Sequence, residues 1–277
     1  MTIHPTWASQ LRVKGSKTSL ISDASTEETY GWDKESAKRK TEKNLQALED
    51  LQYHLYADSS KSLLIVLQGI DAGGKDGAVR NVFTAFNPQG TTVTSFKAPA
   101  GRETSHDYLW RVHAACPSKG SIAVFNRSHY EDLIVPIVHK RLPPRRVEER
   151  FQQIRDFELM LSKEGTKIVK FLLHISRDEQ WERLMARLDD PNKNWKFSMG
   201  DLAERERWPL YTAAFKKIVT ETSVDHAPWY VIPANYKWFR DLAISEIVKN
   251  TLESMSMRWP KPSIEIESAR RALKKLK

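Results

Sequence analysis

A short glycine-rich stretch has the residue types and spacing to hold a phosphate. Residues 69–77 read Gly-Ile-Asp-Ala-Gly-Gly-Lys-Asp-Gly, which contains the Gly-x4-Gly-Lys pattern of a Walker A loop. In such a loop, backbone N–H groups, a lysine and the positive end of the next helix surround an anion. A Ser or Thr that binds Mg²⁺ usually follows the lysine, but here Asp76 follows Lys75. A second carboxylate, Asp71, lies inside the loop, so either acid can take the metal.

The alternative for this stretch is a glycine-rich turn that only connects a strand to a helix. That alternative requires the lysine, the spacing and both flanking elements to coincide by chance. We therefore expect the whole loop to contact phosphate, and the residues concerned are Gly69, Ala72, Gly73, Gly74, Lys75, Asp76 and Gly77.

A second group of polar side chains follows another apolar run. Asn126 and Arg127 come directly after residues 121–125, where Walker-type enzymes usually place a metal-binding acid. An amide holds a metal through its carbonyl oxygen or through water, more weakly than a carboxylate does, and Arg127 would face a phosphate. Glu131 follows one helical turn later and is either part of the same cleft or a surface acid. We interpret His129 as a structural hydrogen-bonding residue.

Further basic residues suit a lid and a cationic groove. Arg183 and Arg187 lie four apart, on one face of a predicted helix, and Lys196 stands between two aromatic residues in the polar loop that follows. Phosphoryl transfer gains from cations that close on the moving group, so residues of about 178–200 are predicted to form a lid. The alternative is a solvated basic face. Three other cations predicted to line a groove are Lys97, Arg102 and Arg111.

The elements that position these residues alternate between strands and helices. Apolar and β-branched runs predict five strands, at 63–67, 91–96, 121–125, 167–175 and 229–232. Helical periodicity predicts helices near 33–55, 78–86, 104–113, 144–164, 178–190, 201–223 and 237–256. This order is typical of an α/β fold with a five-stranded parallel sheet flanked by helices, whose ligands bind at the carboxyl ends of the strands. We expect one domain over 1–277, with a surface arm at 1–32 and a tail at about 258–277 that is helical at its end.

Composition and charge narrow the class of protein. The chain has 277 residues, of which 40% are hydrophobic and 29% charged, as in soluble globular proteins. We find no apolar run of membrane-spanning length and no signal-peptide pattern, so we expect a cytoplasmic protein with no membrane partner. One cysteine, Cys116, excludes an intrachain disulfide and fits a reducing compartment. A net charge of +9 predicts a polyanionic partner, either nucleic acid or a phosphate-rich molecule or polymer.

Three motifs together resemble polyphosphate kinase family 2. They are Gln-Gly-Ile-Asp-Ala-Gly-Gly-Lys-Asp-Gly at 68–77, Phe-Asn-Arg-Ser-His-Tyr-Glu-Asp at 125–132 and Trp-Lys-Phe-Ser at 195–198. Residues from about 33 to 257 follow the family pattern in order, and the aspartate after the lysine is normal in this family. The resemblance implies a P-loop kinase fold similar to thymidylate kinase, with a helical lid. It also implies phosphoryl transfer between inorganic polyphosphate and a nucleotide, Mg²⁺ or Mn²⁺ as cofactor, and a homodimer or homotetramer.

The second motif bears on which nucleotide accepts the phosphoryl group. One branch of the family carries Asp-Arg-Ser-Trp at this site and accepts nucleoside diphosphates, whereas Asn-Arg-Ser-His at 126–129 resembles the branches that accept AMP. One of those takes AMP alone, and another takes AMP and ADP in turn. The compact single domain is similar to the latter, so we expect AMP and ADP as acceptors, with ATP as a final product.

The resemblance also suggests a role for each candidate. Lys75 and the loop amides hold phosphates, and Asp71 binds the metal with help from Asn126. Asn126 removes a fixed negative charge at the strand end and Glu131 adds one a turn later, and from this shift we hypothesise that Glu131 favours AMP as acceptor. The cations expected to stabilise the transferring phosphoryl group are Arg127, Arg187 and Lys196.

Two other functions stay open at this point. One is an ATP-dependent nucleotide kinase, and the other is a non-catalytic polyanion-binding protein with a degenerate P-loop. The chain contains no recognisable nucleic-acid-binding motif, so we expect no nucleic acid partner.

Overall fold

A parallel sheet of five strands forms the centre of the molecule. The structure, a computed structural model, describes residues 7–14 and 21–276. The strands are β1 (Ser62–Gln68), β2 (Thr91–Ser95), β3 (Ile122–Asn126), β4 (Thr166–His174) and β5 (Trp229–Pro233), and their order in the sheet is β2-β3-β1-β4-β5. Every pairing is parallel, which confirms the predicted fold class. Leu67 pairs with both Asn126 and Phe171, so β1 and β3 end within one residue of each other, while β4 runs on to His174.

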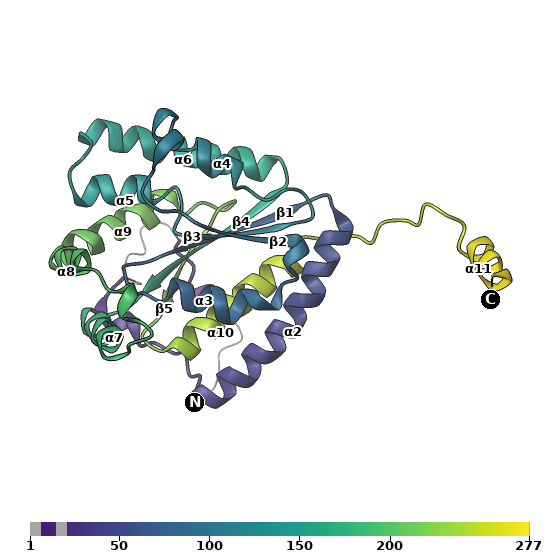
Figure 1. Cartoon of the computed structure of the whole chain (residues 1–277), viewed down its shortest axis with the longest axis horizontal. Coiled ribbons are helices and arrows are strands. Elements are labelled where there is room, and N and C mark those ends of the chain that lie inside the picture. Colours follow the sequence, from purple (N-terminus) through teal and green to yellow (C-terminus); the bar gives the residue numbers. More distant parts are fainter. Residues whose placement is uncertain (1–6, 15–20, 277) are drawn as a thin grey trace.

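Helices cover both faces of the sheet (Figure 1). One face carries α2 (Lys34–Asp58), α3 (Lys75–Val82) and α10 (Lys237–Glu253). The other face carries α4 (Trp110–Ala114), α5 (Glu131–Val138), α6 (Pro144–Lys163) and α9 (Trp208–Thr222). Helix α10 is buried on nearly all sides because it packs against both the sheet and α2. Two more helices, α7 (Arg177–Asp189) and α8 (Met199–Glu206), lie at the end of the sheet where the strands terminate.

The N-terminal arm is less superficial than the sequence suggested. Its described part contains α1 (Trp7–Gln10), and Trp7, Leu11 and Val13 are buried in the core. The Val13 N–H donates to the Trp229 carbonyl at 2.9 Å, so the arm pairs with the edge strand β5. An edge strand has unpaired backbone groups, and a segment that satisfies them is drawn inward. Residues 1–6 and 15–20 of the expected arm lie outside the described residues.

Two expected helices differ from the prediction. The helix expected from 104 is a short 3₁₀ turn, Gly101–Ser105, followed by α4, since the Asp107 side chain accepts the Leu109 N–H at 2.9 Å and starts a new turn. The helix expected over 201–223 breaks at Arg207 into α8 and α9. Pro209 in the first turn of α9 explains the break, because proline has no N–H to donate to the preceding turn.

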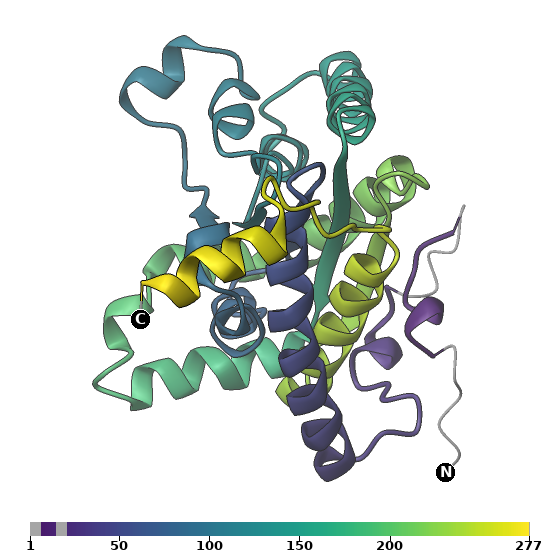
Figure 2. The ribbon, with the colours of Figure 1, turned by 90° about the vertical axis from the view of Figure 1, so that its right-hand side faces the viewer.

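The C-terminal tail stands apart from the body of the molecule. Its helix α11 (Ile266–Lys275) lies beyond an extended segment, as Figures 1 and 2 show. The apolar side chains of Ile266 and Leu273 are exposed. None of the helices in the described part of the chain is long and apolar enough to cross a membrane.

Candidate active site

The glycine-rich loop lies where β1 ends and α3 begins. Strand β1 is buried along its whole length, which fixes the point at which the loop leaves the core. Gly74 has φ +100°, a conformation that side chains rarely adopt, and a Cβ there would lie 2.6 Å from Nη1 of Arg240. The Arg240 guanidinium donates to the Gly74 carbonyl at 3.2 Å. The positive φ therefore favours glycine at this position of the loop.

Lys75 is the buried cation of the loop. Only 7% of the residue is exposed, and Nζ donates to the carbonyls of Gly69 at 2.6 Å and Ile70 at 3.1 Å. Burial lowers the pKa of Lys75, although the nearby Asp71 opposes the shift. The ammonium is thus held by neutral partners and gains from the arrival of an anion.

A polar cavity of about 210 Å³ opens beside the loop. Asp71, Arg127 and Glu131 line it, and Arg127 Nη2 donates to Asp71 Oδ1 at 2.5 Å. Burial alone would lower the pKa of Arg127, but Asp71 and Glu131 outweigh it and raise the pKa. Burial raises the pKa of Glu131, whose carboxylate receives a 3.0 Å hydrogen bond from Gln68 when that amide is oriented to satisfy both its ends. The structure thus brings together three of the predicted catalytic residues.

His129 and Tyr130, which lie between Arg127 and Glu131 in the sequence, belong to a second charge cluster that is fully buried. Glu158 accepts hydrogen bonds from Lys170 Nζ at 2.6 Å and from the Tyr130 hydroxyl at 2.8 Å, and lies 3.3 Å from His129 Nε2. Lys170 Nζ also donates to the Thr222 carbonyl at 2.9 Å. Burial alone would raise the pKa of Glu158, but Lys170 and His129 outweigh it and lower the pKa. His129 is a structural residue, as predicted from the sequence.

The first part of the predicted lid, helix α7, is hydrogen-bonded to the glycine-rich loop. Arg183 on α7 donates to the carbonyls of Ala72 at 3.0 Å and Ala234 at 2.5 Å, and its Nε donates to Glu179 at 2.6 Å. Gln180 donates to the Asp71 carbonyl at 2.9 Å. That Arg183 binds substrate stays a prediction; in the structure its guanidinium donates to backbone carbonyls and to Glu179.

The outer part of the lid contacts Asp76. Lys196 Nζ lies 3.6 Å from one carboxylate oxygen of Asp76, and the Asn126 amide donates to the other at 2.8 Å. This hydrogen bond, together with the charge of Lys196, lowers the pKa of Asp76. Arg187 lies 3.6 Å from Asp201 on α8. Asp76 therefore joins the lid, the loop and the end of β3.

Two of the three groove cations remain near the surface, and the third is engaged within the protein. Lys97 and Arg102 are exposed, with Arg102 5.8 Å above the ring of Trp110. Arg111 donates to the Lys97 carbonyl at 2.8 Å and pairs with two acids, Glu103 and Asp132. That Arg111 binds a polyanion stays a prediction; in the structure its guanidinium pairs with Glu103 and Asp132.

Four polar residues that line the cavity were not identified from the sequence. They are His139, Gln180, Glu204 and Tyr211. The Tyr211 hydroxyl donates to Glu204 Oε2 at 2.7 Å, and His139 Nε2 lies 3.1 Å from the same oxygen. The sequence offered one indication of this group, the seven-residue spacing of Glu204 and Tyr211. That spacing places two residues on one face of a continuous helix, but the helix breaks between them at Arg207.

The donor set of the cavity fits Mg²⁺ with a phosphate ligand. Over residues 7–14 and 21–276, no three His, Cys, Asp or Glu side chains are arranged to hold a metal by themselves. Mg²⁺ in phosphoryl-transfer sites needs only one or two carboxylates, because waters and substrate phosphates complete its shell. Asp71 and Glu131 supply two carboxylates in the same cavity as the loop glycine Gly69.

The strand, glycine loop and helix, beneath a basic lid, define a P-loop kinase fold. Comparisons with known proteins then place the chain more closely. The family model described as Polyphosphate kinase 2 matches residues 31–260, and the chain belongs to that family. The AMP/ADP-polyphosphate phosphotransferase of Meiothermus ruber is 50% identical over 220 residues, covering 79% of this chain and 82% of that protein.

Two further relatives support the same family. The ADP-polyphosphate phosphotransferase of Rhodopseudomonas palustris is 42% identical over 228 residues, covering 78% of this chain and 79% of that protein. The crystal structure of Polyphosphate Kinase 2 from Arthrobacter aurescens TC1 superimposes with a TM-score of 0.91 at 41% identity, covering 98% of this chain and 96% of that chain. The predicted family and fold are confirmed.

Proposed function

We propose that this protein transfers phosphoryl groups from inorganic polyphosphate to AMP and ADP, giving ADP and ATP, in a reversible reaction. The observation that carries the proposal is the position of Lys75, a buried ammonium that donates its hydrogen bonds to neutral carbonyls, beside a cavity lined by Arg127. The names of the relatives support both acceptors, since one names AMP and ADP and the other names ADP.

The arrangement supplies positive charge where the reaction develops negative charge. A phosphoryl group in transfer spreads charge over its oxygens, and fixed cations stabilise it. Lys75 and Arg127 provide such cations from the loop and from the end of β3. Arg187 and Lys196 add two more from the lid, which also excludes water. The acceptor is a phosphate oxygen that is already ionised, so no strong general base is required.

We propose Mg²⁺ as the cofactor, with Mn²⁺ as a substitute. When bound, the metal neutralises phosphate charge and orients the reacting groups. Asp71 would hold it, and Asn126 can assist through its carbonyl oxygen, since its amide nitrogen is engaged with Asp76. The ion pair with Arg127 holds the Asp71 carboxylate at the cavity wall.

The test is a time course of AMP with polyphosphate and Mg²⁺, followed by phosphorus NMR or chromatography. We expect ADP first and ATP second, and no product when polyphosphate is left out. Equal transfer from ATP to AMP in the absence of polyphosphate would favour an ordinary nucleotide kinase. Tight, salt-sensitive binding of DNA or RNA without any turnover would favour the non-catalytic alternative.

We also propose that the protein acts in the cytoplasm as a homodimer or homotetramer. This proposal rests on the family resemblance. Light scattering after size-exclusion chromatography measures the mass directly, against 32.0 kDa for one chain.

A further inference from the structure

The wall of the cavity formed by α8 and α9 carries a carboxylate held by two neighbours. Glu204 lies on α8, Tyr211 on α9 and His139 directly after α5. Tyr211 and His139 both contact Oε2 of Glu204, at 2.7 and 3.1 Å. Neither contact involves the second oxygen, Oε1, and within the described residues no other hydrogen bond reaches it. The side chain of Glu204 is 28% exposed, and it lines the cavity together with Asp71 and Arg127.

The charge of this wall excludes phosphate as its ligand. Burial, followed by the hydrogen bond and charge of Glu204, raises the pKa of Tyr211, so the phenol stays protonated and donates to the carboxylate. A carboxylate accepts hydrogen bonds and repels phosphate oxygens, which carry no hydrogen to donate. Polyphosphate and the phosphates of the nucleotide therefore belong near Arg127 and Lys75, whose positive charges offset the neighbouring carboxylates.

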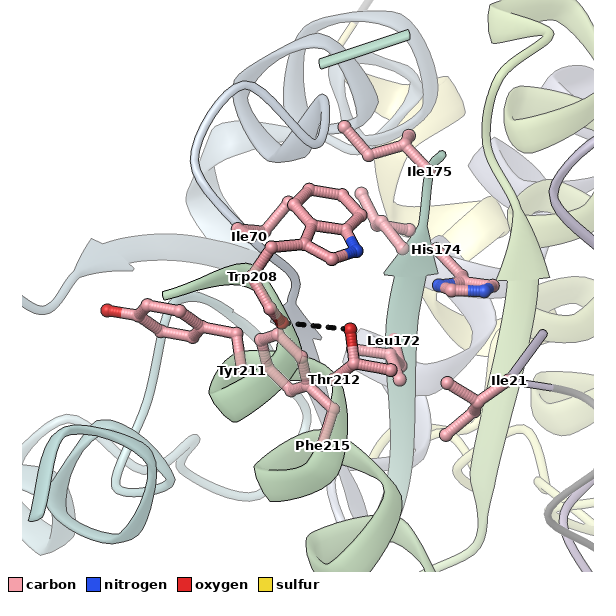
Figure 3. Close-up of a pocket in the computed structure, with 10 residues that line it drawn as sticks. Ile21, Ile70, Leu172, His174, Ile175, Trp208, Tyr211, Thr212 and Phe215 are labelled. Atoms are coloured by element: carbon pink, nitrogen blue, oxygen red, sulfur yellow. Dashed lines mark hydrogen bonds between the residues drawn. The ribbon is translucent and has the colours of Figure 1, made fainter. Parts of the chain in front are cut away.

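Two neutral parts of an adenine nucleotide donate hydrogen bonds in pairs, the vicinal hydroxyls of the ribose and the amino group of the base. Carboxylates contact ribose hydroxyls in nucleotide-binding folds for this reason. The neighbouring surface suits the rest of a nucleoside, because Ile134, Val135 and Phe215 give the cavity apolar lining. Figure 3 shows Tyr211 and Phe215 on the same helix beside an adjoining apolar hollow, with the Tyr211 hydroxyl pointing away from that hollow. The ring of Tyr211 thus separates the apolar hollow from the polar wall.

We propose that Glu204 accepts hydrogen bonds from the ribose hydroxyls of the acceptor nucleotide, and that His139 and Tyr211 are positioning residues for its carboxylate. The inference rests on the proposed function. It divides the cavity into a phosphate end, at Asp71 and Arg127, and a nucleoside end, at Glu204. It also assigns the selection of ribonucleotides to α8, outside the three sequence motifs.

The test compares AMP with 2′,3′-dideoxy-AMP in the full-length protein. Glu204→Ala should raise the KM for AMP roughly tenfold, about 1.4 kcal/mol, and leave the KM for polyphosphate unchanged. The KM for the dideoxy nucleotide should change little, so discrimination between the two nucleotides disappears. Glu206→Gln, an exposed acid on the same helix, is the matched control and should behave like the wild type. Calorimetric Kd values for both nucleotides give a readout that does not depend on turnover.

Two further variants keep the test decisive. If Glu204→Ala does not fold, Glu204→Gln preserves the shape and should lose about threefold in AMP affinity. Tyr211→Phe should lose less than Glu204→Ala, again for AMP only. An equal loss for both nucleotides, or a change confined to polyphosphate, overturns the inference. If the wild type shows no polyphosphate-dependent transfer at all, the proposed function fails instead.

Discussion

Residues 127–131 contribute to two charge clusters, one buried and one at the cavity. His129 and Tyr130 point into the buried cluster around Glu158 and Lys170, where each charge has partners. Arg127 and Glu131 point into the cavity beside the loop. Burial raises the pKa of Glu131, whereas its partners lower that of Glu158.

The difference separates structural charge from functional charge. A buried ion pair with a full set of hydrogen bonds fixes one conformation, and its members are no longer available to a ligand. The cavity charges are only partly satisfied, so a phosphate or metal can improve their surroundings. Mutations in the first cluster should therefore change stability, and mutations in the second should change activity.

The largest effect is expected from breaking the buried pair. Lys170→Met leaves the Glu158 carboxylate without its cation, and we expect the protein to lose about 3–5 kcal/mol of unfolding free energy. Chemical denaturation measures this loss. The double variant Lys170→Met/Glu158→Leu removes both charges and should recover most of it. A single variant as stable as the wild type would show that the cluster does not hold the fold.

The next effect concerns Lys75, the buried cation of the functional cluster. Lys75→Ala should lower kcat by about 10²-fold, on the order of 3 kcal/mol, because the ammonium meets charge that develops during transfer. Its unfolding free energy should fall by less than that of Lys170→Met, since the hydrogen bonds of Lys75 go to neutral carbonyls and no carboxylate is left without a hydrogen-bonded cation. Steady-state kinetics and thermal denaturation on one preparation test both parts. Near-normal turnover in a folded variant would remove Lys75 from the active site.

A smaller effect is expected from the lid. Arg187→Ala should reduce kcat by roughly tenfold and affect the nucleotide KM less, because a lid cation acts on the moving group after binding. Lys193→Ala, whose exposed ammonium pairs with Asp190 in the same lid, is the control. A change in KM alone would assign Arg187 to ground-state binding.

The smallest effect, and the sharpest contrast with Glu158, concerns Glu131 and pH. Its raised pKa means that the folded protein binds the proton more tightly than the unfolded chain does. The ionised form therefore costs stability, and this cost appears as pH rises through the folded pKa. Glu131→Gln should raise the melting temperature relative to the wild type, more at about pH 8 than at about pH 5, while activity falls. If the difference in melting temperature does not depend on pH, Glu131 does not titrate as buried.

The sequence predicted many of the residues of the cavity. It could not predict the others, and the reasons are physical. The Walker loop and the motif at 126–131 are local patterns, so the sequence predicted Lys75, Arg127 and Glu131 beside one another at the strand ends. The partners of a long side chain can lie far away in the sequence, so a local pattern does not predict them. Arg183 reaches a carbonyl 111 positions away, and its partner decides whether it is structural. Glu204 and Tyr211 meet only because the chain breaks at Arg207 and turns.

The contact between Arg240 and Gly74 has a consequence for how the protein is made. The donor of this hydrogen bond is translated 166 residues after its acceptor. A nascent chain therefore exposes the glycine loop long before α10 has left the ribosome to brace it. Until then α2, synthesised still earlier, also lacks the helix it packs against. The loop thus gains this hydrogen bond only after α10 has been made, and a chain released before residue 240 carries the complete motif without it.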